Sequence, residues 1–140
     1  MKKYLVIGNP IEHSLSPILH NHWIKDNKIN AIYEKKKIDE HELGNLILEI
    51  KKRKIDGINI TVPFKKKIIP YLDRLSNEAS STQSVNTVFL DGDKLIGDNT
   101  DIMGFMIGLK KTNYIVEGKK ILILGAGGVV SSIIFALKKM

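Results

Sequence analysis

The chain has 140 residues and a formal net charge of +7, with 43% hydrophobic and 26% charged residues, a balance that fits one folded domain and excludes a disordered or fibrous chain. No apolar run approaches the roughly 18 residues of a membrane span, and the apolar stretch at the N-terminus is too short for a signal peptide, so we expect a cytoplasmic protein without a membrane partner. Only two of the 22 basic residues are Arg, Cys is absent, and the four His are scattered, so we expect neither a nucleic-acid partner nor a metal site.

The first segments of the chain predict strands that alternate with helices. Residues 4–8 are typical of a short apolar strand. Ser16 is expected to be the N-cap, and Pro17 the first position, of a helix that continues to about residue 27. Residues 31–37 predict a second strand.

The next segments continue this alternation. Asp39 and Glu42 have the spacing of a capping box at the start of a helix. The apolar residues of that helix recur at i, i+3, i+4 and i+7: Leu43, Leu46, Ile47 and Ile50. A strand is expected over residues 57–62 because Pro63 ends it, and a short helix over residues 64–71.

The last segments predict a hairpin, a helix and a strand. Residues 85–90 and 94–96 flank an Asp-Gly-Asp turn, which is a hairpin signal. Asp101 is expected to cap a helix that ends at residue 111, and residues 120–124 read as a buried strand. The alternation predicts an α/β fold with a mainly parallel sheet flanked by helices.

A glycine-rich turn follows the strand expected over residues 120–124. It comprises Gly125, Ala126, Gly127 and Gly128, and a helix from about Val129 to the end of the chain comes after it. Strand, glycine turn and helix in this order are typical of a loop that binds the pyrophosphate of a dinucleotide at a helix N-terminus. A glycine turn that only packs a strand on a helix is the alternative interpretation.

Polar residues cluster at predicted strand ends and in the loops that follow. They are Ser14, Ser16, Asn59, Thr61, Lys65, Asn86, Thr87, Asn99, Thr100 and Asp101. Ligands of α/β sheets gather at the carboxyl ends of strands, so these side chains could converge on a small polyhydroxylated anion. Each of them could instead cap a helix, form a turn or face solvent.

Several long motifs of the chain resemble those of the shikimate dehydrogenases. They are residues 8–17, Asn21, and residues 57–65, 85–88 and 98–101, so the resemblance covers the whole chain. It implies a substrate-binding catalytic domain over residues 1–111. Residues 112–140 would then be a linker and the beginning of a Rossmann domain.

The resemblance also implies an activity, the NADP-dependent reduction of 3-dehydroshikimate to shikimate in aromatic amino-acid biosynthesis. Lys65 and Asp101 would be the catalytic pair. The residues implied to bind substrate are Ser14, Ser16, Asn59, Thr61, Lys65, Asn86 and Asp101. Those implied to bind NADP are Gly125, Ala126, Gly127, Gly128, Val129 and Asn77. Lys66 and Lys67 are expected to face water without a role, and a homodimer is possible.

Three places depart from the family pattern. Gln83-Ser84 replaces the usual Gly-Ala, Ile102 stands where Gly is common, and Val130-Ser131 replaces a typical Ala-Arg. Two alternatives therefore stay open beside the main interpretation. One is a quinate or shikimate dehydrogenase with relaxed cofactor choice, and the other is a catalytically silent shikimate-binding domain.

Overall fold

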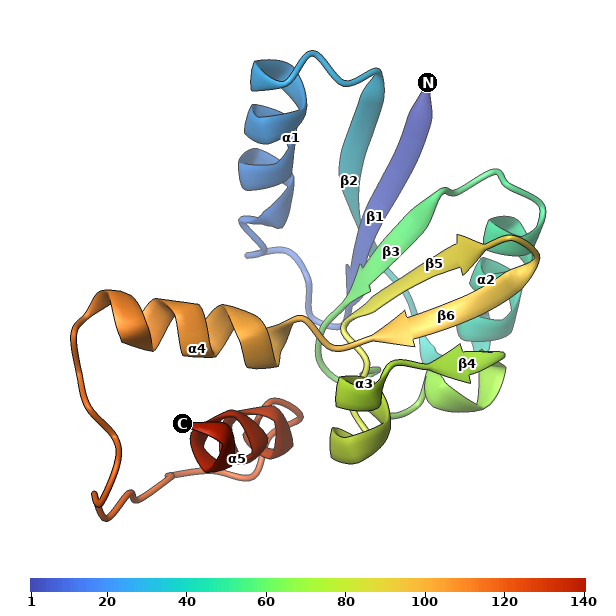
Figure 1. Cartoon of the computed structure of the whole chain (residues 1–140). Coiled ribbons are helices and arrows are strands. Elements are labelled where there is room, and N and C mark those ends of the chain that lie inside the picture. The colour runs from blue at the N-terminus through green and yellow to red at the C-terminus, as the bar shows by residue number, and fades with distance from the viewer.

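The apolar segments of the chain assemble into one six-stranded sheet in the order β2-β1-β3-β5-β6-β4. The computed structural model describes residues 1–140 (Figure 1). The strands are β1 Lys2–Gly8, β2 Ala31–Lys37, β3 Gly57–Ile60, β4 Arg74–Leu75, β5 Thr87–Asp91 and β6 Lys94–Asp98. Only β5 opposes the direction of the other strands, because it pairs antiparallel with both β3 and β6. The predicted α/β fold with a mainly parallel sheet is confirmed.

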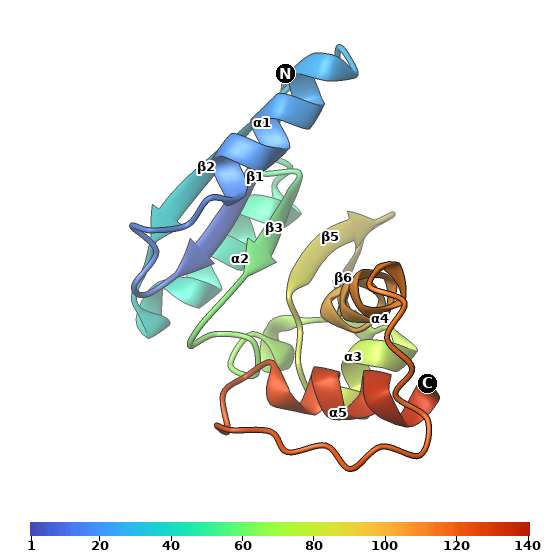
Figure 2. The ribbon, with the colours of Figure 1, turned by 90° about the vertical axis from the view of Figure 1, so that its left-hand side faces the viewer.

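Helices cover both faces of this sheet. They are α1 Ser16–Asp26, α2 Leu43–Lys51, α3 Asn77–Thr82, α4 Asp101–Lys111 and α5 Val130–Lys139, with short 3₁₀ turns η1 Glu40–Glu42 and η2 Ile69–Tyr71. Figure 2 shows α5 beneath α4, and the two helices are in contact. None of the helices has the length and apolar character needed to cross a membrane.

The alternation of side chains along β1 divides the core between the two faces. Leu5 and Ile7 join a cluster of 16 buried residues that includes the apolar face of α2. Val6 points to the opposite face, where it packs with Ile11 and Tyr33 beside α1. All four apolar residues predicted for α2 are buried, and each such burial contributes roughly 1.5–3 kcal/mol.

The direction of the strands brings several loops to one edge of the sheet. β1, β3 and β6 all end there, and β5 begins there because it runs the opposite way. Asn59 pairs with Thr87, and Thr87 pairs with Asp98. The loops that carry the predicted site residues therefore meet at this edge.

Four local expectations are wrong. Asp101 does not cap α4, because it is the first residue of that helix and Thr100 takes the N-cap position, without a side-chain cap. Residues 120–124 form no strand, because they run past α5 away from the sheet and have no strand to pair with (Figure 2). Residues 64–71 form turns and η2, since Pro70 has no N–H to continue an α-helix. Ser16 is the first residue of α1 and Leu15 takes the N-cap position, without a side-chain cap.

Candidate active site

An ion pair at this edge of the sheet joins Lys65 and Asp101. The Lys65 ammonium donates to Asp101 Oδ2 over 2.7 Å. The two side chains are 12% and 25% exposed, so the pair is largely shielded from water yet still accessible. The main chain of Lys65 is fixed because its carbonyl accepts from the Val85 N–H at 2.9 Å. Asp101 is fixed as the first residue of α4.

Asn86 holds the other oxygen of the Asp101 carboxylate. Its amide donates to Asp101 Oδ1 and to the Thr100 hydroxyl, both at 2.9 Å. Its carbonyl oxygen accepts from the Thr100 N–H at 3.0 Å. The carboxylate is therefore oriented from both sides, and its charge is shared between a cation and an amide.

Asn59 joins the same network through a residue that sequence analysis missed. The hydroxyl of Tyr33 donates to Asn59 Oδ1 over 2.6 Å, and the Asn59 amide donates to Thr87 Oγ1 over 3.0 Å. Burial raises the pKa of the Tyr33 hydroxyl well above its usual range, so that the hydroxyl stays a donor. No signal in the sequence separates Tyr33 from an ordinary apolar position of β2.

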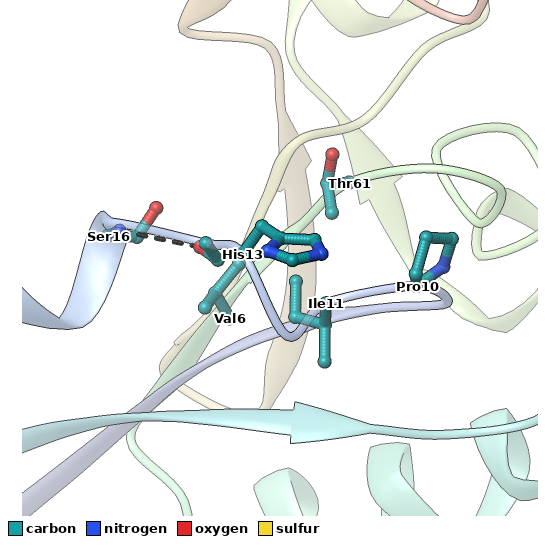
Figure 3. Close-up of a pocket in the computed structure, with 7 residues that line it drawn as sticks. Val6, Pro10, Ile11, His13, Ser16 and Thr61 are labelled. Carbon is teal, nitrogen blue, oxygen red and sulfur yellow. Dashed lines mark hydrogen bonds between the residues drawn. The ribbon is translucent and has the colours of Figure 1, made fainter.

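A cleft of about 270 Å³ lies beside this network, between the β1–α1 loop and Thr61. Ser14, Ser16 and Thr61 are among its lining residues, and Figure 3 shows Ser16 and Thr61 around it. Its other lining residues are Val6, Pro10, Ile11 and His13. The Ser16 N–H donates to Ser14 Oγ over 3.3 Å, which draws the two serines together. Hydroxyl groups on an apolar floor suit a small polar ligand.

Glu12 orders the loop that forms one wall of this cleft. Hydrogen bonds from main-chain N–H groups, including that of Ile11 at 3.0 Å, together with Lys37, lower the pKa of its carboxyl to about 2. Lys35 adds a hydrogen bond to the Glu12 carbonyl. The carboxylate thus binds the loop to β2 at neutral pH.

A second cleft, of about 340 Å³, separates Lys65 from the glycine-rich turn. Lys65, Lys66 and Lys67 line it together with Val62, Pro63, Ala126, Gly127 and Gly128. Lys66 and Lys67 are exposed, as expected, but their place on this cleft was not predicted. Asn77, Gly125 and Val129 are not among its lining residues.

The residues of the second cleft fit a phosphate-bearing cofactor such as a dinucleotide. Gly125 has a φ of +115°, which an L side chain rarely adopts, and a side chain on Gly127 would point into open space. The turn leads into the N-terminus of α5, where unpaired N–H groups favour an anion. Lys66 on the opposite wall adds a positive charge, whereas Lys65 and Lys67 are ion-paired with Asp101 and Glu40.

Fold and site together define an α/β domain that carries a lysine–aspartate ion pair at the carboxyl edge of its sheet, with Lys65 on the cleft that faces a glycine-rich turn. A family model described as the shikimate dehydrogenase substrate binding domain matches residues 6–88. The NADP(+) shikimate dehydrogenase of Pelagibacter ubique is 65% identical over 139 residues, which are 99% of this chain and 52% of that protein.

Solved structures agree with the sequence comparisons. The crystal structure of shikimate dehydrogenase from Aquifex aeolicus is 43% identical with a TM-score of 0.93, over 99% of this chain and 52% of that one. The Thermus thermophilus enzyme in complex with NADP(H) and shikimate is 34% identical with a TM-score of 0.91, over 99% and 52%. The chain belongs to the shikimate dehydrogenase family and spans about half the length of these relatives.

Proposed function

We propose that the protein containing this chain catalyses the NADP-dependent reduction of 3-dehydroshikimate to shikimate. This chain would supply the substrate site and the catalytic pair. The observation that carries the proposal is the Lys65–Asp101 ion pair, held at 2.7 Å. Lys65 lines the cleft at the glycine-rich turn, and Thr61 of the same loop lines the hydroxyl-bearing cleft.

Lys65 and Asp101 have complementary roles in this proposal. When a carbonyl is reduced, negative charge develops on its oxygen, and a nearby ammonium stabilises that charge and supplies the proton. The carboxylate of Asp101 orients the ammonium and balances its charge. NADPH, when bound, supplies the hydride.

The remaining site residues bind and orient the substrate. Ser14 and Ser16 would donate to the shikimate carboxylate, while Asn59, Thr61 and Asn86 would bind ring hydroxyls. A site that pairs each substrate oxygen rejects analogues that lack one, because its own polar groups are then left unpaired.

The cofactor would lie along the glycine-rich turn and α5. Residues 112–140 are then a linker and the beginning of the dinucleotide-binding domain, while residues 1–111 form the catalytic domain. Gly125, Ala126, Gly127, Gly128, Val129 and Asn77 are the proposed cofactor contacts. A homodimer and a cytoplasmic location stay predictions.

The test is an assay of the protein that contains this chain, at its natural length. Shikimate and NADP⁺ are supplied, and NADPH formation is followed by absorbance, with NAD⁺ in a parallel reaction. We expect NADPH formation that depends on shikimate. Calorimetric binding of shikimate without any turnover would favour the silent binding domain instead, and equal rates with NAD⁺ would favour relaxed cofactor choice.

A further inference from the structure

A buried polar cluster lies beside the Lys65–Asp101 pair and is not explained by substrate binding. Its members, all less than a tenth exposed, are Thr82, Ser84, Asn99 and Ser132. They come from α3, the loop before β5, the loop between β6 and α4, and α5. The cluster therefore connects the catalytic domain with the helix that follows the glycine-rich turn.

Asn99 is the centre of this cluster. Its side-chain oxygen accepts from the N–H of Asp101 at 3.1 Å. Its amide nitrogen lies 2.8 Å from Ser132 Oγ, 2.9 Å from the Ser84 carbonyl oxygen and 3.1 Å from Thr82 Oγ1, so its two N–H groups have three acceptors within reach. The planar amide of Asn99 thus contacts the main chain of Asp101 through its oxygen and Ser132 of α5 through its nitrogen.

Ser84 makes a second connection to the glycine-rich turn. Its hydroxyl donates to the Gly128 carbonyl over 3.1 Å. Ser84 is part of the Gln83-Ser84 departure from the family pattern, where Ala is usual. The departure therefore adds a hydrogen bond between the loop before β5 and the turn, which an alanine could not make.

We propose that Asn99 is a positioning residue that couples the place of the glycine-rich turn to that of the Asp101 carboxylate. Asn99 is 2% exposed, so water cannot replace a lost partner, and without Ser132 the amide would have to turn toward Thr82 Oγ1 to keep both N–H groups paired. A shift of Ser132 would therefore move or loosen Asn99, and with it the N-terminus of α4. The coupling itself needs no substrate, but its importance for catalysis rests on the proposed function.

Hydrogen exchange of the ligand-free protein tests the coupling directly. Ser132→Ala removes the contact on α5, and the readout is exchange at the Asp101 N–H, which Asn99 protects. We expect about fivefold faster exchange there, the effect of losing one hydrogen bond of typical strength. Ser131→Ala is the matched control, because the neighbouring hydroxyl is buried but has no hydrogen-bond partner.

We expect the Asp101 N–H to exchange faster than in wild type in Ser132→Ala, and at the wild-type rate in Ser131→Ala. Equal exchange at Asp101 in both variants would overturn the coupling. This outcome does not depend on turnover, so it is distinct from a failure of the proposed function, which would appear as wild-type protein without shikimate-dependent NADPH formation.

Kinetics of the same variants separate positioning from general stability. Ser84→Ala loosens the turn, and we expect it to raise the KM for NADP⁺ several-fold. Ser132→Ala also loosens the N-terminus of α4 through Asn99, so we expect it to lower kcat several-fold as well. A uniform loss of activity that follows the fraction of unfolded protein would show that the cluster only stabilises the fold.

Discussion

Gly8 ends β1 next to Thr61 and Ile11, which line the hydroxyl-bearing cleft, and its replacement by Ala should damage both stability and substrate binding. A Cβ at this position would lie 2.6 Å from Thr61 Cγ2, 3.0 Å from the Val62 carbonyl oxygen and 3.1 Å from Ile11 Cδ1. The Thr61 side chain can rotate, but the carbonyl belongs to main chain that is held by the Asn9 N–H at 3.0 Å. Relief therefore requires movement of the loop that carries Thr61.

Forced insertion of a methyl group into a packed site costs about 1–3 kcal/mol. We expect Gly8→Ala to lower the free energy of unfolding by this amount in urea titrations and to raise the KM for shikimate, because Thr61 is displaced. Gly104→Ala is the control: Gly104 lies within α4 and a Cβ there meets no atom within 4 Å, so it should stabilise the protein by roughly 0.5–1 kcal/mol. Wild-type stability and KM in Gly8→Ala would refute the packing argument.

Three further variants test other parts of the site. Because the pKa of the Glu12 carboxyl is lowered in the folded state, its contribution to stability is full above pH 4.5 and is lost as the pH falls toward 2. In urea titrations, Glu12→Gln should therefore be less stable than wild type at neutral pH, and this difference should disappear near pH 2. A difference that stays constant with pH would contradict this expectation. Tyr33→Phe should cost about 1 kcal/mol and raise the KM for shikimate with little change in kcat, whereas an unchanged KM would show that Tyr33 does not position Asn59. Asp101→Asn should lower kcat strongly, and full activity would remove the carboxylate from the mechanism.

The elements that the sequence predicted well are those with a regular pattern and a local signal. α2 has its apolar residues at helical spacing. The predicted capping box lies directly before it, at the start of η1, where the Asp39 N–H donates to Glu42 Oε2 over 2.7 Å. The β5–β6 hairpin has an Asp-Gly turn, and Gly92 has the positive φ that such a turn requires. These local preferences agree with the tertiary packing, so pattern alone was sufficient.

The errors arise where a local pattern depends on a distant partner. The apolar run over residues 120–124 resembles a strand, but strand formation needs a neighbour for its backbone groups, and here it has none. β4 has only two residues, so it has no pattern to detect, and it exists because Arg74 and Leu75 pair with β6.

In the candidate site too, the contacts that the sequence could not predict are those between residues far apart in the chain. Lys65 and Asp101 were placed together by resemblance, and the structure brings them into contact across 36 positions of sequence. Asn99 was expected to bind a small anion or to form a turn, and its role at the centre of the buried cluster was missed because Ser84 and Ser132 lie 15 and 33 positions away. Tyr33 was missed, since the contact of its hydroxyl with Asn59 depends on the pairing of both β2 and β3 with β1.

The central claim is that Lys65 acts on the reacting oxygen with Asp101 as its partner, and steady-state kinetics of Lys65→Ala test it most directly. The protein that contains this chain is assayed with shikimate and NADP⁺, and Lys52→Ala, an exposed lysine at the end of α2, is the control. We expect kcat to fall about 10²-fold to 10⁴-fold in Lys65→Ala, with a much smaller change in KM, and no change in Lys52→Ala. A wild-type kcat with only a raised KM would contradict the claim and make Lys65 a residue that binds substrate without taking part in the reaction.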